Sequence, residues 1–139
     1  MNDGLTWLTL PARLDSLPQF NEFLHEAGRR ASLPEAEFGK LELVWEEIFV
    51  NIASYAYPEG ETGNAEVGYA VTEPGCLLVQ VRDSGQAFNP LKRDPPDLRA
   101  DLAGRTPGGL GIFLVQSLAD SVGYAYVDGR NVLYLTFRG

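Results

Sequence analysis

The run Gly108-Gly109-Leu110-Gly111 leads directly into the apolar residues 112–119, which are expected to form a helix. Glycines let the backbone approach a ligand closely, and the free amides at a helix start attract anions. This stretch is therefore a candidate phosphate-binding site. Close helix packing explains such a run equally well on its own, and the sequence contains neither a Rossmann fingerprint nor a Walker loop.

Asp83 ends an alternating apolar strand and is followed by a glycine-containing turn, Ser84-Gly85-Gln86-Ala87-Phe88. Residues 77, 79, 81 and 83 share one face of that strand, so a buried face would carry the Asp83 carboxylate into the core, where it needs a partner. A carboxylate at the mouth of an apolar pocket can accept a hydrogen bond from an exocyclic amine such as that of adenine, with Gly85 leaving room for the ring. A tight turn after a strand is the plainer alternative.

Glu47 and Asn51 lie together on the flank of a helix expected to begin near Glu35 and to stop before Pro58. At about 100° per residue, the apolar residues of this helix fall in one broad arc, and they are Leu41, Val44, Trp45, Ile48, Ile52 and Tyr55. A carboxylate and an amide are thus held at the edge of a buried face. An amphipathic helix that merely begins its polar side there would look the same.

The other elements are short and have clear boundary signals. Ser16 to Gln19 and Ser32 to Glu35 both have the form of a capping box, which predicts a helix start at each. The expected strands are residues 5–10, a hairpin of 66–72 and 76–83 with Pro74-Gly75 in its turn, and a hairpin of 124–127 and 132–137 that turns at Asp128-Gly129. Residues 89–107 have no periodicity and contain four prolines, which is typical of a lid, a binding loop or a disordered segment.

Size and composition limit the classes of protein. A chain of 139 residues fits one domain, here 1–139. The sequence has no signal peptide and no apolar run long enough for a membrane span, so we expect a cytoplasmic protein. Cys76 has no disulfide partner and is expected in the core. A net charge of −8 argues against nucleic acid and favours a basic protein partner.

The order of these pieces resembles the GHKL (Bergerat) ATP-binding fold shared by gyrase, the Hsp90 chaperone and histidine kinases, where they are called the N box, G1 box and G2 box. The short length, the strand and two helices before Asn51, and the ending Asn131-Val132-Leu133-Tyr134-Leu135 are most similar to the anti-sigma-factor serine kinases. The resemblance covers nearly the whole chain. It implies an α+β fold, a two-layer sandwich of a mainly antiparallel mixed sheet with helices on one face.

The resemblance also implies roles for individual residues. Asn51 would coordinate Mg²⁺ between the phosphates of ATP, and Glu47 would be the base that activates the attacking hydroxyl. Asp83 would bind adenine, and residues 89–107 would form a lid. The residues implied to contact the nucleotide are Asn51, Asp83, Gly85, Ala87, Phe88, Arg105, Gly108, Gly109, Leu110 and Gly111.

Two positions depart from the family pattern. Tyr55 stands where many members have a histidine, and Ala87 stands at the second glycine of the G1 box. The implied function is a switch protein that phosphorylates a serine or threonine of a small STAS-type antagonist and alternately sequesters a sigma factor, as a homodimer. Two alternatives stay open, a module that clamps a partner in an ATP-dependent manner without turnover, and a detached histidine-kinase-like ATP lobe. His25 is interpreted as a helix-surface residue, because a phospho-accepting histidine needs a separate dimerising hairpin.

Overall fold

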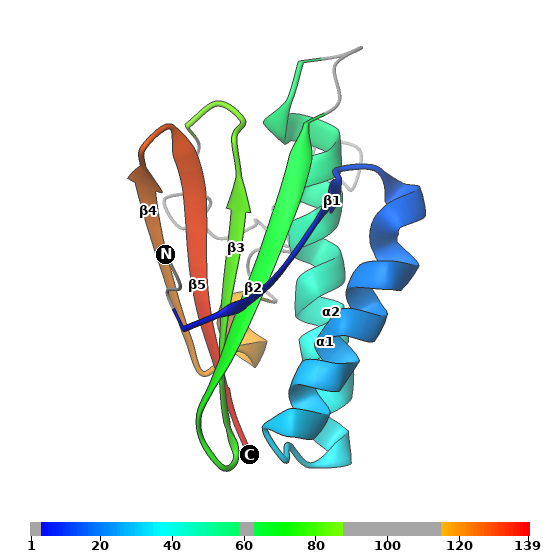
Figure 1. The fold of residues 1–139 in the computed structure, drawn as a ribbon, viewed down its shortest axis with the longest axis vertical. Coiled ribbons are helices and arrows are strands. Elements are labelled where there is room, and N and C mark those ends of the chain that lie inside the picture. Colours follow the sequence, from blue (N-terminus) through cyan, green and yellow to red (C-terminus); the bar gives the residue numbers. More distant parts are fainter. Residues whose placement is uncertain (1–3, 59–62, 88–114) are drawn as a thin grey trace, which may run out of the picture.

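The computed structural model describes residues 4–58, 63–87 and 115–139 (Figure 1). The helical elements are the 3₁₀ turn η1 (Leu14–Ser16), α1 (Leu17–Arg30), α2 (Glu35–Asn51) and the π-helix η2 (Ile52–Ala56). The strands are β1 (Thr6–Pro11), β2 (Asn64–Glu73), β3 (Cys76–Asp83), β4 (Ser121–Val127) and β5 (Arg130–Arg138). Residues 115–118 are also helical, which is the described part of the helix expected over 112–119.

The described strands form one five-stranded sheet in the order β1-β2-β3-β5-β4, and every neighbouring pair is antiparallel. Helices α1 and α2 lie side by side on one face of this sheet (Figure 1). The two-layer α+β fold class expected from the sequence is thereby confirmed. Neither α1 nor α2, nor any other helix in the described ranges, is long and apolar enough to cross a membrane.

The core lies between the two helices and the inner face of the sheet. The alternation of the strands directs one set of side chains to this face, and these are Ala65, Val67, Tyr69, Leu77, Val79, Val81, Leu133, Leu135 and Phe137. From the helices, Phe20, Trp45 and Phe49 meet with ring centroids 5.0 to 5.2 Å apart. Aromatic pairs at such distances add to the free energy gained by burial alone.

Both predicted hairpins are confirmed, with turns set by backbone conformation. Asp128 and Gly129 have φ angles of 53° and 76°, which suits the type I′ turn that matches the twist of the flanking strands. Gly75, in the turn between β2 and β3, has a φ of 83°. The glycines were placed correctly because few other residues adopt positive φ without strain.

The predicted capping box at Ser16 is wrong. The chain enters α1 directly from η1, so Ser16 has the helical angles φ −84° and ψ −12°, and no side-chain cap hydrogen bond forms. An N-cap residue needs an extended backbone to turn its oxygen toward the free amides. Ser16 is instead buried, with 4% of its surface exposed.

The second predicted capping box is also wrong, because Ser32 ends α1 rather than starting α2. The backbone amide of Leu33 donates to the Gly28 carbonyl at 3.1 Å, and that of Ser32 donates to the Arg29 carbonyl at 3.0 Å. This pair of bonds is a Schellman motif, which places Ser32 at the left-handed position with a φ of 57°. Pro34, with φ −60° and ψ 151°, is the N-cap of α2.

The second helix changes its winding where the candidate site begins. Helix α2 ends at Asn51, and the next five residues, Ile52–Ala56, continue as the π-helix η2. The predicted buried arc is confirmed at Leu41, Val44, Trp45, Ile48 and Ile52, and Phe49 joins it. The side chain of Tyr55 lies outside the described residues. Single π turns within helices are rare and occur frequently at functional sites.

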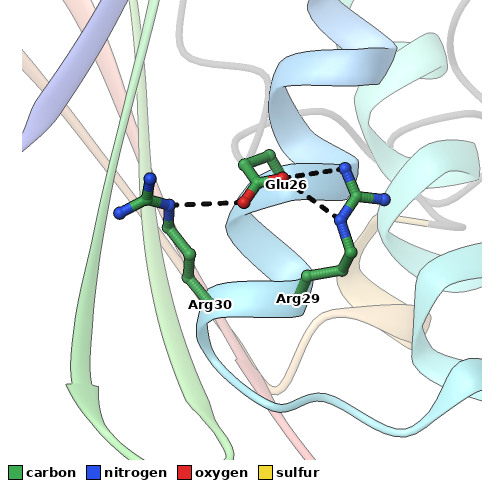
Figure 2. A network of polar contacts seen from close by, with 3 residues as sticks. All are labelled: Glu26, Arg29 and Arg30. Carbon is green, nitrogen blue, oxygen red and sulfur yellow. Dashed lines mark hydrogen bonds and ion pairs between the residues drawn. The ribbon is translucent and has the colours of Figure 1, made fainter.

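The exposed end of α1 carries a small ion-pair network, shown in Figure 2. Glu26 accepts a 2.9 Å hydrogen bond from Arg29 and lies 3.5 Å from Arg30, one turn further along the helix. The Arg29 guanidinium, and secondarily that of Arg30, lowers the pKa of the Glu26 carboxyl below its usual range. Exposed pairs of this kind contribute little to stability, so the network does not hold the fold together.

The left-handed Ser32 leads to a first prediction. A non-glycine residue at positive φ costs roughly 1 kcal/mol, so Ser32→Gly is expected to raise the free energy of unfolding by about 0.5–1 kcal/mol in urea titrations. The control is Ala36→Gly, on an exposed position of the first turn of α2. Glycine at position 36 should lower the free energy of unfolding by about the same amount. Equal effects of the two glycines would contradict the Schellman assignment.

Candidate functional site

Asp83 is the buried carboxylate of the described site. It ends β3 with 8% of its surface exposed and faces the core, as the alternation of the strand predicted. Its Oδ1 accepts hydrogen bonds from the Gly85 backbone amide at 2.9 Å and from the side-chain amide of Asn131 at 3.0 Å. The expectation that this carboxylate has a partner is confirmed. Neither bond uses Oδ2.

Asn131 organises the turn that follows Asp83. It lies opposite Asp83 in the pairing of β3 with β5 and is also 8% exposed. Its Nδ2 donates to the Gln86 carbonyl at 2.8 Å and lies 3.4 Å from the Gly85 carbonyl, while its Oδ1 accepts from the Tyr124 hydroxyl. One side chain therefore joins a carboxylate, a turn and strand β4.

Sequence reasoning missed the role of Asn131 and used it only as part of a strand ending. A signal was present, because residues 131, 133, 135 and 137 alternate on one face and Asn131 is the polar member of that apolar series. A polar side chain on a buried face needs a hydrogen-bond partner. What the alternation does not reveal is that β5 pairs with β3 in the register that sets Asn131 against Asp83.

A second set of contacts connects the end of η2 to the turn after β3, and we call it the helix–turn junction. It consists of Ala56 and Tyr57 on one side and Ser84 and Gln86 on the other. The Gln86 amide donates to the Ala56 carbonyl at 3.2 Å, and the Ser84 amide donates to the Tyr57 hydroxyl at 3.0 Å. The helix that carries Glu47 and Asn51 is thereby attached to the turn that carries Asp83.

Tyr57 also ties this junction to the sheet. Its hydroxyl donates to the Asn64 carbonyl at 2.6 Å, at the start of β2. Burial raises the pKa of the Tyr57 phenol above its usual range, and the carboxylates of Asp83 and Glu66 raise that pKa further. The phenol therefore keeps the proton that the bond to Asn64 requires.

Gly85 has a packing reason to be glycine. A Cβ at this position would lie 2.1 Å from the Ala56 carbonyl oxygen, which belongs to the backbone and cannot move aside cheaply. The sequence interpretation gave Gly85 the task of leaving room for a ring. The structure shows that any side chain at position 85 would first push apart the helix–turn junction.

Glu47 and Asn51 both lie half-buried on α2, one turn apart, and Asn51 is its last residue. The neighbouring Glu46 points elsewhere, since its Oε2 accepts a 3.3 Å hydrogen bond from Asn21 of α1. Glu42, one turn earlier, lies 3.6 Å from His25, also on α1. Because Glu47 is rotated about 100° from Glu46 around the helix axis, it lies away from this contact with α1.

The remaining candidates divide into two groups. Ala87 is exposed at the end of the described turn. The lid residues 89–107, with Arg105, and the residues Phe88, Gly108, Gly109, Leu110 and Gly111 lie outside the described residues. The structure thus places Glu47, Asn51, Asp83, Gly85 and Ala87, and brings the helix that carries the first two to the turn that carries the last two.

The described donors suit a magnesium ion that is held jointly with a nucleotide. Within the described ranges, no group of three or more His, Cys, Asp or Glu side chains is placed to hold a metal. Asn51 would supply one amide oxygen, a ligand type that Mg²⁺ accepts, and Mg²⁺ usually takes only one or two protein ligands together with phosphates and water. Asn51 at the end of α2 fits that arrangement.

Comparisons with known proteins show the family of this chain. The family of histidine kinase-like ATPase domains matches residues 10–137. A serine-protein kinase RsbW of Listeria monocytogenes is 30% identical over 137 residues, which are 96% of this chain and 86% of that protein. The serine/threonine-protein kinase BtrW of Bordetella bronchiseptica is 30% identical over 96 residues, which are 69% of this chain and 67% of that protein.

A solved structure shows the same fold. The crystal structure of the RsbU and RsbW domains of a Mycobacterium tuberculosis protein superposes with a TM-score of 0.67 and 16% identity, and the match covers 96% of this chain. The chain spans 32% of that longer protein. At this identity the comparison concerns the fold alone.

The two-layer fold is that of an ATPase domain of the histidine kinase type, and the chain belongs to that family, whose model matches residues 10–137. Within it, the chain is similar to the RsbW anti-sigma-factor serine kinases over most of its length. This family membership supports a role in anti-sigma regulation and the use of ATP.

The bond between Asn131 and Asp83 gives a second prediction. Asn131→Ala leaves a buried carboxylate and the Gln86 carbonyl with one donor fewer, so the free energy of unfolding should fall by about 1–3 kcal/mol. Asn64→Ala is the control, because Asn64 contributes its backbone carbonyl to the junction. It should change stability by no more than about 0.5 kcal/mol. Equal losses of unfolding free energy in Asn131→Ala and Asn64→Ala, measured in urea titrations, would contradict the role assigned to the Asn131 side chain.

Tyr57 gives a third prediction, on pH. A folded-state pKa above the unfolded value means that the stabilisation is complete below the ordinary tyrosine pKa of about 10 and is lost as the pH rises through the folded-state pKa. Tyr57→Phe should cost about 1 kcal/mol at neutral pH and should lose less stability than wild type when urea titrations are repeated above pH 10. An equal loss of stability above pH 10 in Tyr57→Phe and in wild type would rule out this role of the Tyr57 phenol.

Proposed function

We propose that this chain binds Mg-ATP and phosphorylates a serine or threonine of a small STAS-type antagonist protein, and that it alternately sequesters a sigma factor or a similar target. Relatives named serine-protein kinases support the type of reaction. The proposal treats residues 1–139 as one cytoplasmic domain with a lid at about 89–107, acting as a homodimer. It gives no role to nucleic acid or to a membrane, consistent with a net charge of −8.

The observation that carries the proposal is the helix–turn junction. Its two hydrogen bonds, from Gln86 to Ala56 and from Ser84 to Tyr57, hold the end of the helix against the turn after β3. The junction thereby fixes the position of the helix relative to the end of β3. The helix carries the proposed base and metal ligand, and the end of β3 carries the proposed adenine-binding carboxylate. Phosphoryl transfer depends mainly on such positioning, together with neutralisation of charge.

In the proposed reaction, Glu47 accepts the proton of the attacking hydroxyl. The hydroxyl oxygen forms a bond to the γ-phosphorus as the bond to the β,γ-bridging oxygen breaks, so that phosphoserine or phosphothreonine and ADP result. A carboxylate positioned within hydrogen-bond reach of the hydroxyl can accept its proton in the transition state. Mg²⁺ held by Asn51 would neutralise charge on the phosphates.

Asp83 is proposed to select adenine. Its Oδ1 is engaged by Asn131 and Gly85, and its Oδ2 is the proposed acceptor for the exocyclic amine. Ala87 and Phe88 are proposed to lie beside the base, Arg105 to contact a phosphate from the lid, and residues 108–111 to face the phosphates with their backbone amides. With these proposed roles, the nucleotide site includes residues that follow the described turn in the sequence.

The fourth prediction tests the base. With ATP labelled on its γ-phosphate, Mg²⁺ and a STAS-type antagonist protein from the same genome, Glu47→Ala should transfer label about 10²- to 10⁴-fold more slowly than wild type. Glu46→Ala is the matched control, because Glu46 lies about 100° from Glu47 around the helix and contacts Asn21 of α1. Its transfer rate should stay close to that of wild type.

Two results would contradict the proposal. Absence of transfer with wild type, equal to that of Glu47→Ala, would remove the kinase activity. Loss of transfer in Glu46→Ala with Glu47→Ala still active would assign the base to the other glutamate. An acid-labile product would show phosphohistidine instead, as expected of a detached histidine-kinase lobe.

A second candidate function is an ATP-dependent clamp that binds its partner without turnover. It is favoured by Tyr55, which stands four residues after Asn51 in the π-helix η2 where many family members have a histidine, and by Ala87 in place of a glycine. A clamp would show partner affinity that depends on ATP together with slow or absent transfer. Stoichiometric phosphorylation would exclude it.

A further inference from the structure

Two large apolar side chains remain exposed on the described part of α2. Leu43 has 41% of its surface exposed and Val50 has 42%. Around the helix axis they lie on the same side of Glu47, about 40° from it for Leu43 and about 60° from it for Val50. Along the axis Leu43 lies one turn before Glu47 and Val50 one turn after it. We call Leu43, Glu47 and Val50 the outer stripe of α2.

The outer stripe lies apart from the other faces of the helix. Leu41, Val44 and Ile48 face the core, and Glu42 and Glu46 face α1. Isolated apolar side chains are common on protein surfaces. What distinguishes Leu43 and Val50 is that both border the residue proposed to receive the proton of the acceptor.

Helix α2, which carries the stripe, is acidic as a whole. Helix α2 contains five glutamates, Glu35, Glu37, Glu42, Glu46 and Glu47, and a single basic residue, Lys40. Lys40 is itself paired with Glu37 at 3.1 Å. A segment that lies along this surface is therefore favoured by basic side chains and disfavoured by acidic ones.

We infer that the outer stripe is the docking contact for the segment of the protein substrate that surrounds its acceptor hydroxyl, and that this segment carries an apolar side chain close to the acceptor and at least one Lys or Arg. The inference rests on the proposed kinase function, since the acceptor must reach Glu47. It adds a specificity contact to that function, one made by Leu43 and Val50 rather than by the residues proposed to hold ATP.

The dimensions of the two chains agree with this docking. Along the helix axis Leu43 lies about 6 Å and Val50 about 4.5 Å from Glu47, at about 1.5 Å per residue. An extended segment advances about 3.3 Å per residue. An apolar side chain two residues from the acceptor is therefore level with Leu43, and one at one or two residues on the other side is level with Val50.

The fifth prediction uses two variants of the stripe, Leu43→Asp and Val50→Asp. Each should weaken binding of the small antagonist by about tenfold or more in calorimetric titrations, because an apolar contact is lost and a carboxylate is added to an acidic surface. The affinity for a fluorescent ATP analogue should change less than about twofold, a small fraction of the 1.4 kcal/mol that a tenfold change represents. The control is Val71→Asp, since Val71 on β2 is 38% exposed and lies outside the helix.

The outcomes separate the docking contact from the chemistry, because label transfer is measured in the same mixtures. Unchanged antagonist binding by both stripe variants would overturn the docking contact even if wild type transfers phosphate. Binding that is weakened in the stripe variants but not in Val71→Asp would support it, and absence of transfer by wild type would then remove the kinase step alone. Failure of wild type to bind the antagonist would overturn both.

Discussion

The buried carboxylate of Asp83 is the constraint on which the described site depends. A polar side chain with 8% of its surface exposed is stable only if hydrogen-bond partners replace the water it has lost. The Gly85 amide and the Asn131 side chain supply those partners. Because Asn131 also binds the Gln86 carbonyl and the Tyr124 hydroxyl, the same requirement fixes the turn after β3 and joins it to β4. The Asp83 carboxylate is costly to bury without partners, so the hydrogen bonds that it requires determine the positions of the residues around it.

The helix–turn junction connects the turn after β3 to the helices. The Ala56 carbonyl at the end of η2 accepts from Gln86, and it approaches Gly85 so closely that a Cβ there would lie 2.1 Å from its oxygen. Tyr57, whose pKa is raised chiefly by burial, keeps the proton that connects it to Asn64. The π-helix that follows Asn51 therefore ends where the helix meets the turn. The family glycine at position 85 has a structural reason that does not require a ligand.

Helix α2 divides its surface among several tasks. One side packs Trp45 and its neighbours into the core, a second makes polar contacts with α1 through Glu42 and Glu46, and a third carries Glu47 and Asn51 toward the proposed nucleotide. This division explains why adjacent glutamates have different roles. A rotation of about 100° per residue moves a carboxylate from a contact between helices to a site that faces a substrate. The outer stripe of Leu43, Glu47 and Val50 then completes the proposed surface for a protein partner with apolar and basic side chains.

The sequence by itself determined the fold class, the two hairpins, the buried arc of α2 and the burial of Asp83, because apolar periodicity, glycines at positive φ and strand alternation are local signals. It located both helix starts, since α1 begins at Leu17 and α2 at Glu35, but it assigned the wrong capping interactions to them. The form of a capping box does not reveal that a 3₁₀ turn precedes α1, or that Ser32 closes a Schellman motif. Only the tertiary structure decided that Asn131 faces Asp83, that Gly85 meets Ala56 and that Tyr57 connects helix, turn and sheet. These partners are 48, 29 and up to 27 residues apart in the sequence, and contacts at such separations depend on how the sheet pairs and how the helices pack on it.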